Sequence, residues 1–167
     1  MDEKTVRWRN QRPTTTTNKG DQRFNDEPYV LGGIQRCCQA YWKVSVEGKD
    51  DWLLGAALPD VDRKGQLLLS PEKGFWVIIL ANGTNLTAMN DCEEVLDKSM
   101  PKIVGIHVDY VKKSVTFYDE GEDDRSQIYK FHNGPKIDEW VSPIFSPWNN
   151  DEKPIAILPI LNRNENS

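Results

Sequence analysis

Apolar and polar residues alternate cleanly between residues 41 and 47, a pattern that predicts a half-buried β-strand. Trp42, Val44 and Val46 fall on one face, and the residues between them fall on the other. Short segments rich in β-branched or aromatic residues recur along the chain, at residues 5–9, 52–58, 75–80, 103–110, 115–118, 127–131, 141–145 and 155–161. A helical stripe is found only as a weak candidate at residues 91–98.

Turn-forming residues such as Gly48, Pro59, Pro71 and Gly83 separate these segments. A parallel sheet would need crossover helices, which the pattern does not offer. The sequence therefore predicts an all-β fold, a two-layer antiparallel β-sandwich of many short strands with little helix.

Residues 10–27 interrupt this rhythm with a polar segment that contains Pro13, four consecutive threonines and Gly20. Loops longer than about 12 to 15 residues in a compact domain are usually functional or mobile. The segment is therefore either a recognition loop or a tolerated insertion, and the sequence leaves both interpretations open.

Composition narrows the class of protein. A chain of 167 residues fits one domain with a real core. The net charge of −5 lacks the basic stripe that binding to a phosphate backbone requires, so nucleic acid is not an expected partner. No apolar run is long enough for a membrane span, and the polar start lacks a signal-peptide core, so neither membrane insertion nor targeting is expected.

The residue types that usually carry chemistry form no recognisable site. Cys37, Cys38 and Cys92 lack the spacing of a zinc site or disulfide framework, and reduced thiols fit a cytoplasmic location. His107 and His132 belong to no catalytic motif. The acidic run at residues 119–124 lacks the spacing of a calcium loop and is interpreted as a solvated hairpin tip. Neither catalytic residues nor a metal site is predicted.

Two overlapping triplets, beginning at Asn82 and Asn85, satisfy the acceptor pattern for N-glycosylation. Such triplets arise often by chance. Both are interpreted as loop chemistry rather than as glycan sites.

A series of short motifs resembles the PRY-SPRY (B30.2) family when taken in order. The motifs are YVLG at residues 29–32, YWKV at 41–44, WLLG at 52–55, RKG at 63–65, LSPEKGFW at 69–76, VGIHVDY at 104–110, VTFY at 115–118, IYKF at 128–131 and PIFSP at 143–147. Lys43 and Val111 depart from the acidic residues that are usual at these places. Each motif is weak by itself, but the complete order is specific.

The resemblance implies one B30.2 domain made of an N-terminally truncated PRY part at residues 1–36 and a SPRY part at 37–161, followed by a polar tail at 162–167. The strand with an LDP motif that normally opens the domain has no counterpart. We therefore expect the chain to be a piece of a larger protein, with one sheet edge exposed or differently covered.

The residues of these motifs are expected to build the scaffold. Strand alternation makes the large aromatic side chains core anchors, and Asp109 is expected to accept hydrogen bonds from a nearby turn, because a buried carboxylate must be satisfied. Arg63 is expected to pair with an acid or to cover an aromatic face. The predicted structural residues are Trp42, Trp52, Arg63, Phe75, Trp76, Asp109 and Tyr110.

Partner recognition in the resembling family is concentrated in variable loops, which correspond here to residues 10–27, 59–73, 82–102 and 119–140. Large apolar side chains with a polar rim would be the contacts. The candidates are Arg12, Thr15, Lys19, Arg23, Leu86, Met89, Met100, Trp140 and Trp148, and each apolar one has the alternative of being a satellite of the core.

The resemblance implies a non-catalytic protein-binding module, the C-terminal recognition domain of a tripartite-motif (TRIM) ubiquitin ligase or of an innate immune receptor. Its partner would be a protein ligand or a ubiquitination substrate. Ubiquitin transfer and zinc would belong to a RING or B-box outside this chain, and a coiled coil there would dimerise the parent, so no cofactor is expected here. The alternatives are a butyrophilin-like sensor of a small phosphorylated metabolite and an autoinhibitory or oligomerising domain.

Overall fold

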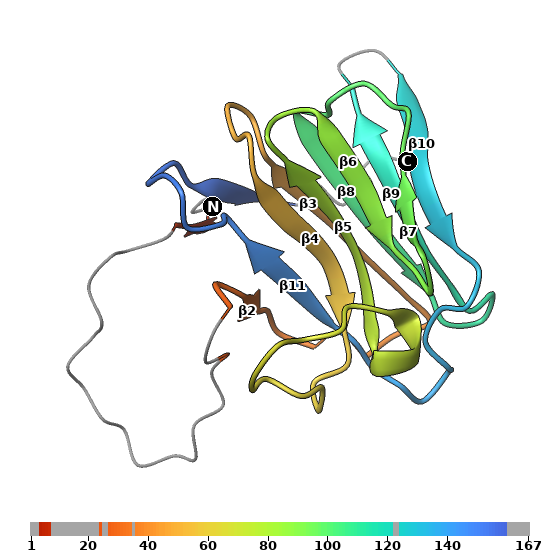
Figure 1. Ribbon diagram of the computed structural model, residues 1–167. Coiled ribbons are helices and arrows are strands. Elements are labelled where there is room, and N and C mark those ends of the chain that lie inside the picture. Colours follow the sequence, from red (N-terminus) through yellow and green to blue (C-terminus); the bar gives the residue numbers. More distant parts are fainter. Residues whose placement is uncertain (1–3, 8–23, 25–26, 35, 122–123, 160–167) are drawn as a thin grey trace.

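Two antiparallel sheets lie face to face in the computed structural model, which describes residues 4–7, 24, 27–34, 36–121 and 124–159 (Figure 1). The first sheet has the order β1 (Lys4–Val6), β12 (Ile155–Leu158), β3 (Gln39–Ser45), β8 (Ile103–Asp109), β9 (Ser114–Glu120) and β10 (Arg125–Phe131). The second has the order β2 (Val30–Leu31), β11 (Ser142–Ser146), β4 (Trp52–Ala57), β5 (Phe75–Ala81), β6 (Asn85–Met89) and β7 (Glu93–Val95). The predicted two-layer antiparallel β-sandwich is confirmed.

The first sheet has one buried face, as the alternation in β3 predicts. Trp42 and Val44 point into the core between the sheets, whereas Tyr41 and Lys43 on the opposite face are half-buried. On β8, Ile106 lies opposite Trp42 and Val104 lies opposite Val44, and both complete this side of the core.

The central strands of the second sheet, β4 and β5, are buried on both faces. All six residues of β4 are buried. Trp52, Leu54 and Ala56 belong to the core between the sheets, whereas Leu53 and Ala57 belong to a second apolar cluster on the outer face. The long connection from β4 to β5 carries the short 3₁₀ helix η1 (Pro71–Lys73) and packs Val61, Leu67 and Leu69 against this cluster. A continuous apolar run such as β4 is typical of a strand that is covered on both sides.

The predicted helix at residues 91–98 is wrong, and three strands, β6, β7 and β2, were not predicted. The segment contains β7, whose Val95 pairs with Thr87 of β6, and the backbone N–H of Leu96 donates to the carbonyl of Leu86. A weak helical pattern is a poor guide, because the tertiary context, here the pairing with β6, overrides the local propensity. The third missed strand, β2, is two residues long.

Asp109 ties the end of β8 to the following turn. Its carboxylate accepts a 2.8 Å hydrogen bond from the backbone N–H of Lys112 and a 3.0 Å bond from the side-chain amide of Gln39. The hydrogen bond from Lys112 is the main cause that holds the pKa of this buried carboxyl below its usual value.

Replacing Asp109 with alanine should lower the free energy of unfolding by about 1 to 3 kcal/mol at neutral pH, because both donors lose their acceptor. A lowered pKa in the folded state contributes stability above the unfolded-state pKa, and this contribution is lost as pH falls through the folded-state pKa. The difference between wild type and Asp109→Ala, measured by urea denaturation, should therefore shrink from pH 7 to pH 3. An equal difference at both values, or an equal loss in the exposed control Asp138→Ala, would contradict this role.

Candidate partner-binding site

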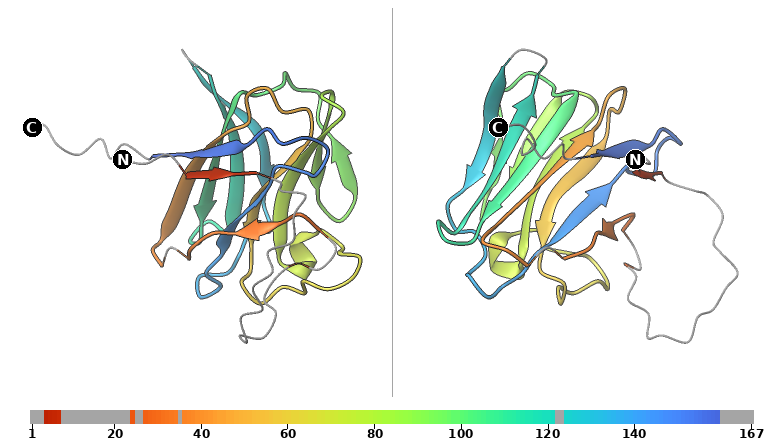
Figure 2. Two further views of the ribbon diagram at one scale, coloured as in Figure 1. Left: turned by 90° about the vertical axis from the view of Figure 1, so that its left-hand side faces the viewer. Right: turned by 180° about the vertical axis from the view of Figure 1, so that it is seen from behind.

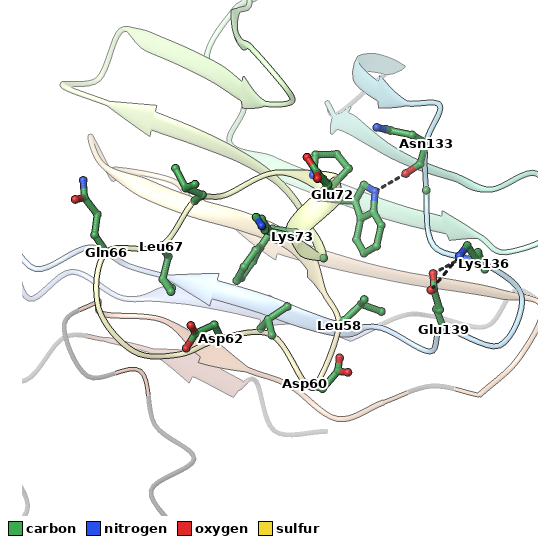
Figure 3. Close-up of a pocket in the computed structure, with 17 residues that line it drawn as sticks. Leu58, Asp60, Asp62, Gln66, Leu67, Glu72, Lys73, Asn133, Lys136 and Glu139 are labelled. Atoms are coloured by element: carbon green, nitrogen blue, oxygen red, sulfur yellow. Dashed lines mark hydrogen bonds and ion pairs between the residues drawn. The ribbon is translucent and has the colours of Figure 1, made fainter.

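A hollow of about 720 Å³ lies at one end of the sandwich, between the connection that follows β4 and the connection that follows β10 (Figure 3). Residues 58–74 form one wall and residues 133–139 contribute the other. These segments belong to two of the four loops that were predicted to carry recognition, and Figure 1 shows both at the same end of the sheets.

The base of the hollow is apolar and its rim exposes further apolar side chains. Phe75, Trp76 and Val61 line it with largely buried side chains. Leu68 also lines it and is 71% exposed, and Ile137, which lies between lining residues of the other wall, is 54% exposed. An apolar base with exposed apolar residues at the rim is typical of a surface that accepts a large side chain of a partner.

The polar lining of the hollow is acidic. Four carboxylates, those of Asp60, Asp62, Glu72 and Glu139, face two ammonium groups, those of Lys73 and Lys136, which leaves a formal charge of −2. Lys136 also pairs with Glu139 at 3.8 Å, and its backbone N–H donates to the same carboxylate at 2.9 Å. The hollow therefore favours a cationic partner over an anionic one.

Two aromatic side chains of the scaffold, Trp76 and Tyr110, hold the segment of residues 133–141, which contains the second wall. The indole N–H of Trp76 donates to the carbonyl of Asn133 at 2.9 Å. At the other end of the wall, the backbone N–H of Val141 donates to the hydroxyl of Tyr110 at 3.1 Å, and the Trp140 ring packs edge-on against Tyr110 with centroids 5.0 Å apart. Both ends of the wall are thus fixed to the sandwich.

Gly134 brings this wall close to the turn between β8 and β9. Its N–H donates to the carbonyl of Lys113 at 2.9 Å, and a Cβ atom at this position would lie 2.6 Å from backbone atoms of Lys113 and Ser114. Only glycine permits this approach without a shift of the backbone.

The opposite wall, residues 58–74, is closed by a backbone hydrogen bond between its two ends. The N–H of Leu58 donates to the carbonyl of Gly74, whose φ of +85° suits glycine. Arg63 donates to the carbonyl of Pro59 at 2.6 Å, and its guanidinium lies 5.7 Å from the centre of the Phe24 ring, one of the environments predicted for it.

Asn133 also borders a neighbouring polar pocket of about 520 Å³. Asn90, Asp91 and Glu94 line it from the β6–β7 hairpin, and Tyr129 lines it from β10. The hydroxyl of Tyr129 donates to Glu94 at 2.7 Å. A third predicted loop region, residues 82–102, therefore reaches the same end of the sandwich.

The contact residues predicted from the sequence that the structure describes do not line the hollow. Arg12, Thr15, Lys19 and Arg23 lie outside the described residues. Leu86 is wrong as a contact, because it is fully buried in β6 and belongs to the core. Met89 and Trp140 are half-buried against the core, Met100 is 38% exposed, and Trp148 is half-buried with an unusual φ of +59°.

The lining residues that were not predicted from the sequence include Asp60, Asp62, Leu68, Glu72, Lys136 and Glu139. The sequence indicated these residues only in so far as they lie in loops that are bounded by family motifs. The predicted structural residues Trp42, Trp52, Phe75, Trp76, Asp109 and Tyr110 are all buried.

Nothing in the described part of the chain resembles a metal centre, since no three His, Cys, Asp or Glu side chains gather there in a way that could hold an ion. Over the same residues, no helix has the length and apolarity needed to cross a membrane.

Residues 39–158 match the family model described as the SPRY domain, and the chain therefore belongs to the SPRY family. Human pyrin is 38% identical over 84% of this chain, and bovine E3 ubiquitin-protein ligase TRIM21 is 36% identical over 93% of it. The chain spans only 18% and 34% of the lengths of these two relatives.

A solved structure of the TRIM65 PSpry domain has the same fold. It superimposes with a TM-score of 0.65 at 18% identity and covers 81% of this chain and 70% of that one. SPRY domains are interaction modules that bind protein ligands. The resemblance to the PRY-SPRY family is thereby confirmed.

Replacing Tyr110 with phenylalanine should leave the buried N–H of Val141 without a partner, at a cost of about 1 to 3 kcal/mol. We expect faster amide exchange at Val141 and Gly134 than in wild type, measured by hydrogen–deuterium exchange. The matched control is Tyr118→Phe on the outer face of β9. If exchange of the wall were unchanged in Tyr110→Phe, or equally faster in the control, the hydroxyl would not anchor the wall.

Proposed function

We propose that this SPRY domain recognises a segment of a partner protein and binds it in the hollow between residues 58–74 and residues 133–139. The observation that carries the proposal is the shape of the hollow, which combines a buried apolar base, an exposed apolar rim and two anchored walls. Preformed walls reduce the conformational entropy lost on binding.

The chemistry of the hollow defines the partner segment. An aliphatic or aromatic side chain would bury itself against Phe75 and Leu68, and a neighbouring lysine or arginine would meet the carboxylates of Asp60, Asp62 and Glu72. The preferred segment is therefore apolar and basic.

The role of the whole protein is inferred from its relatives. TRIM21, whose name describes an E3 ubiquitin-protein ligase, supports a parent in which this domain selects a ubiquitination substrate. Ubiquitin transfer and any zinc would belong to a RING outside the 167 residues, and the domain itself would be non-catalytic. The proposal includes an innate-immune setting, for which the similarity to pyrin is the support, and a cytoplasmic location, for which the free cysteines Cys37, Cys38 and Cys92 are the support.

A sensor of phosphorylated metabolites is the weaker candidate for the hollow. Binding a diphosphate needs several converging cations, whereas the hollow has a formal charge of −2. Isothermal titration with an isoprenyl diphosphate should therefore give no heat of binding. Saturable heat that is lost on replacing Lys73 and Lys136 would favour the sensor instead.

Peptides selected from a random display library against the wild-type domain test the proposal. The selected sequences should combine an apolar residue with Lys or Arg, and Leu68→Ala should weaken the best peptide about tenfold, the effect expected of a central apolar contact. Affinities would be measured by fluorescence anisotropy.

The matched control is Val95→Ala, which truncates an equally exposed apolar side chain on β7, outside the hollow. It should bind the peptide as wild type does. Selected peptides that bind Leu68→Ala and Asp60→Asn with unchanged affinity would place the binding site elsewhere.

A further inference from the structure

The outer face of the first sheet carries a cluster of cationic and aromatic side chains that neither the core nor the hollow uses. Its strands β3, β8, β9 and β10 are turned toward the viewer in the right-hand view of Figure 2. Strand pairing brings the side chains into two adjacent rows, one with Tyr41, His107, Thr116 and Lys130 and the other with Lys43, Gly105, Tyr118 and Gln127.

Arg125 and Glu120 organise the centre of this face. The guanidinium of Arg125 lies 3.6 Å from the centre of the Tyr118 ring and 5.3 Å from that of Tyr41. Glu120 pairs with Arg125 at 3.2 Å and with Lys43 at 3.3 Å, and it also accepts a hydrogen bond from the Tyr41 hydroxyl. One carboxylate is therefore shared between two cations, and it holds the aromatic rings and both cations in fixed positions.

Gly105 is required for this arrangement. A Cβ atom there would lie 2.5 Å from a carboxylate oxygen of Glu120 and 2.6 Å from the hydroxyl of Tyr41. The contact between these two side chains passes over the bare backbone of β8.

The local charge of the face is positive although the chain carries a net charge of −5. Four cations, those of Lys43, Lys112, Arg125 and Lys130, lie on or beside the two rows, and two carboxylates oppose them. Glu120 pairs with Lys43 and Arg125, and Asp109 interacts with Lys112, which leaves an excess of two positive charges. Burial lowers the pKa of His107, and the charges of Arg125, Lys112 and Lys130 lower it further, whereas Asp109 acts in the opposite direction.

We propose that this cationic face, defined by Lys43, Lys112, Arg125 and Lys130 with the rings of Tyr41 and Tyr118, is a second binding surface that takes an acidic peptide segment of a partner protein. Carboxylates of the segment would meet the lysines, and its backbone or aromatic side chains would lie on the two tyrosine rings.

The size of the face favours a peptide over a nucleic acid. Four adjacent strands span about 14 Å, which matches about four residues of extended chain. A nucleic acid would extend past the face onto the surface of a protein with net negative charge, where its phosphates would be repelled.

The face lies on the outer side of the first sheet, whereas the hollow lies between two loop segments at one end of the sandwich, and the two carry opposite charge. The two surfaces therefore select opposite partners and can be tested separately.

A labelled hexaglutamate peptide tests the proposal by fluorescence anisotropy at low ionic strength, with hexaglutamine as the uncharged probe. We expect hexaglutamate to bind and hexaglutamine not to bind. Replacing both Lys112 and Lys130 with glutamine should weaken binding about fivefold, as two exposed charge pairs would. The double variant Lys64→Gln/Lys98→Gln changes the net charge equally at exposed sites away from the face and should bind as wild type does.

Three outcomes would overturn the proposal: no binding of hexaglutamate, equal weakening in the two double variants, or tighter binding of a hexathymidylate oligonucleotide than of the peptide. The hollow variant Leu68→Ala should bind hexaglutamate as wild type does. The experiments therefore distinguish an error in the proposed function of the hollow from an error in the proposal for the cationic face.

Discussion

The burial of both faces of strands β4 and β5, at the centre of the second sheet, is the constraint on which the rest of the structure depends. Strand β4 has no solvent-exposed face, so its outer side chains Leu53 and Ala57 need a cover as much as its inner ones do. The first sheet covers one side, and the β4–β5 connection folds back over the other (Figure 1). Because removing such side chains from water is the main favourable term in folding, the connection is held against the sheet. The same connection then forms one wall of the hollow.

The large aromatic residues of the family motifs link the scaffold to the other wall. Trp76 and Tyr110 bury their rings in the core, yet each has one polar atom that reaches the segment after β10. A buried indole N–H or hydroxyl needs a partner, and here the partners are Asn133 and Val141. The residues that identify the fold therefore also position a surface that they do not themselves provide.

The sequence was sufficient for the class of fold but not for the site. Strands with strong alternation or continuous apolar runs, such as β3 and β4, could be predicted because one or both faces are buried. Strands β6 and β7 could not, because β7 is acidic and exposed and is defined by its pairing with β6. Because β6 was not predicted, Leu86 was assigned to a loop, whereas the alternation within β6 buries it together with Ala88. The hollow brings together residues about 60 to 80 positions apart in the sequence, and hydrophobic periodicity carries no information about such a contact.

Backbone amide chemical shifts in solution, measured as a selected apolar and basic peptide is added, test most directly whether the hollow is the site of recognition. The largest changes should fall on Leu68, Gly74, Gly134 and Ile137, with little change at Gly105 on β8 and Thr116 on β9. Changes confined to residues outside the two walls would contradict the claim that the hollow is the principal site of recognition.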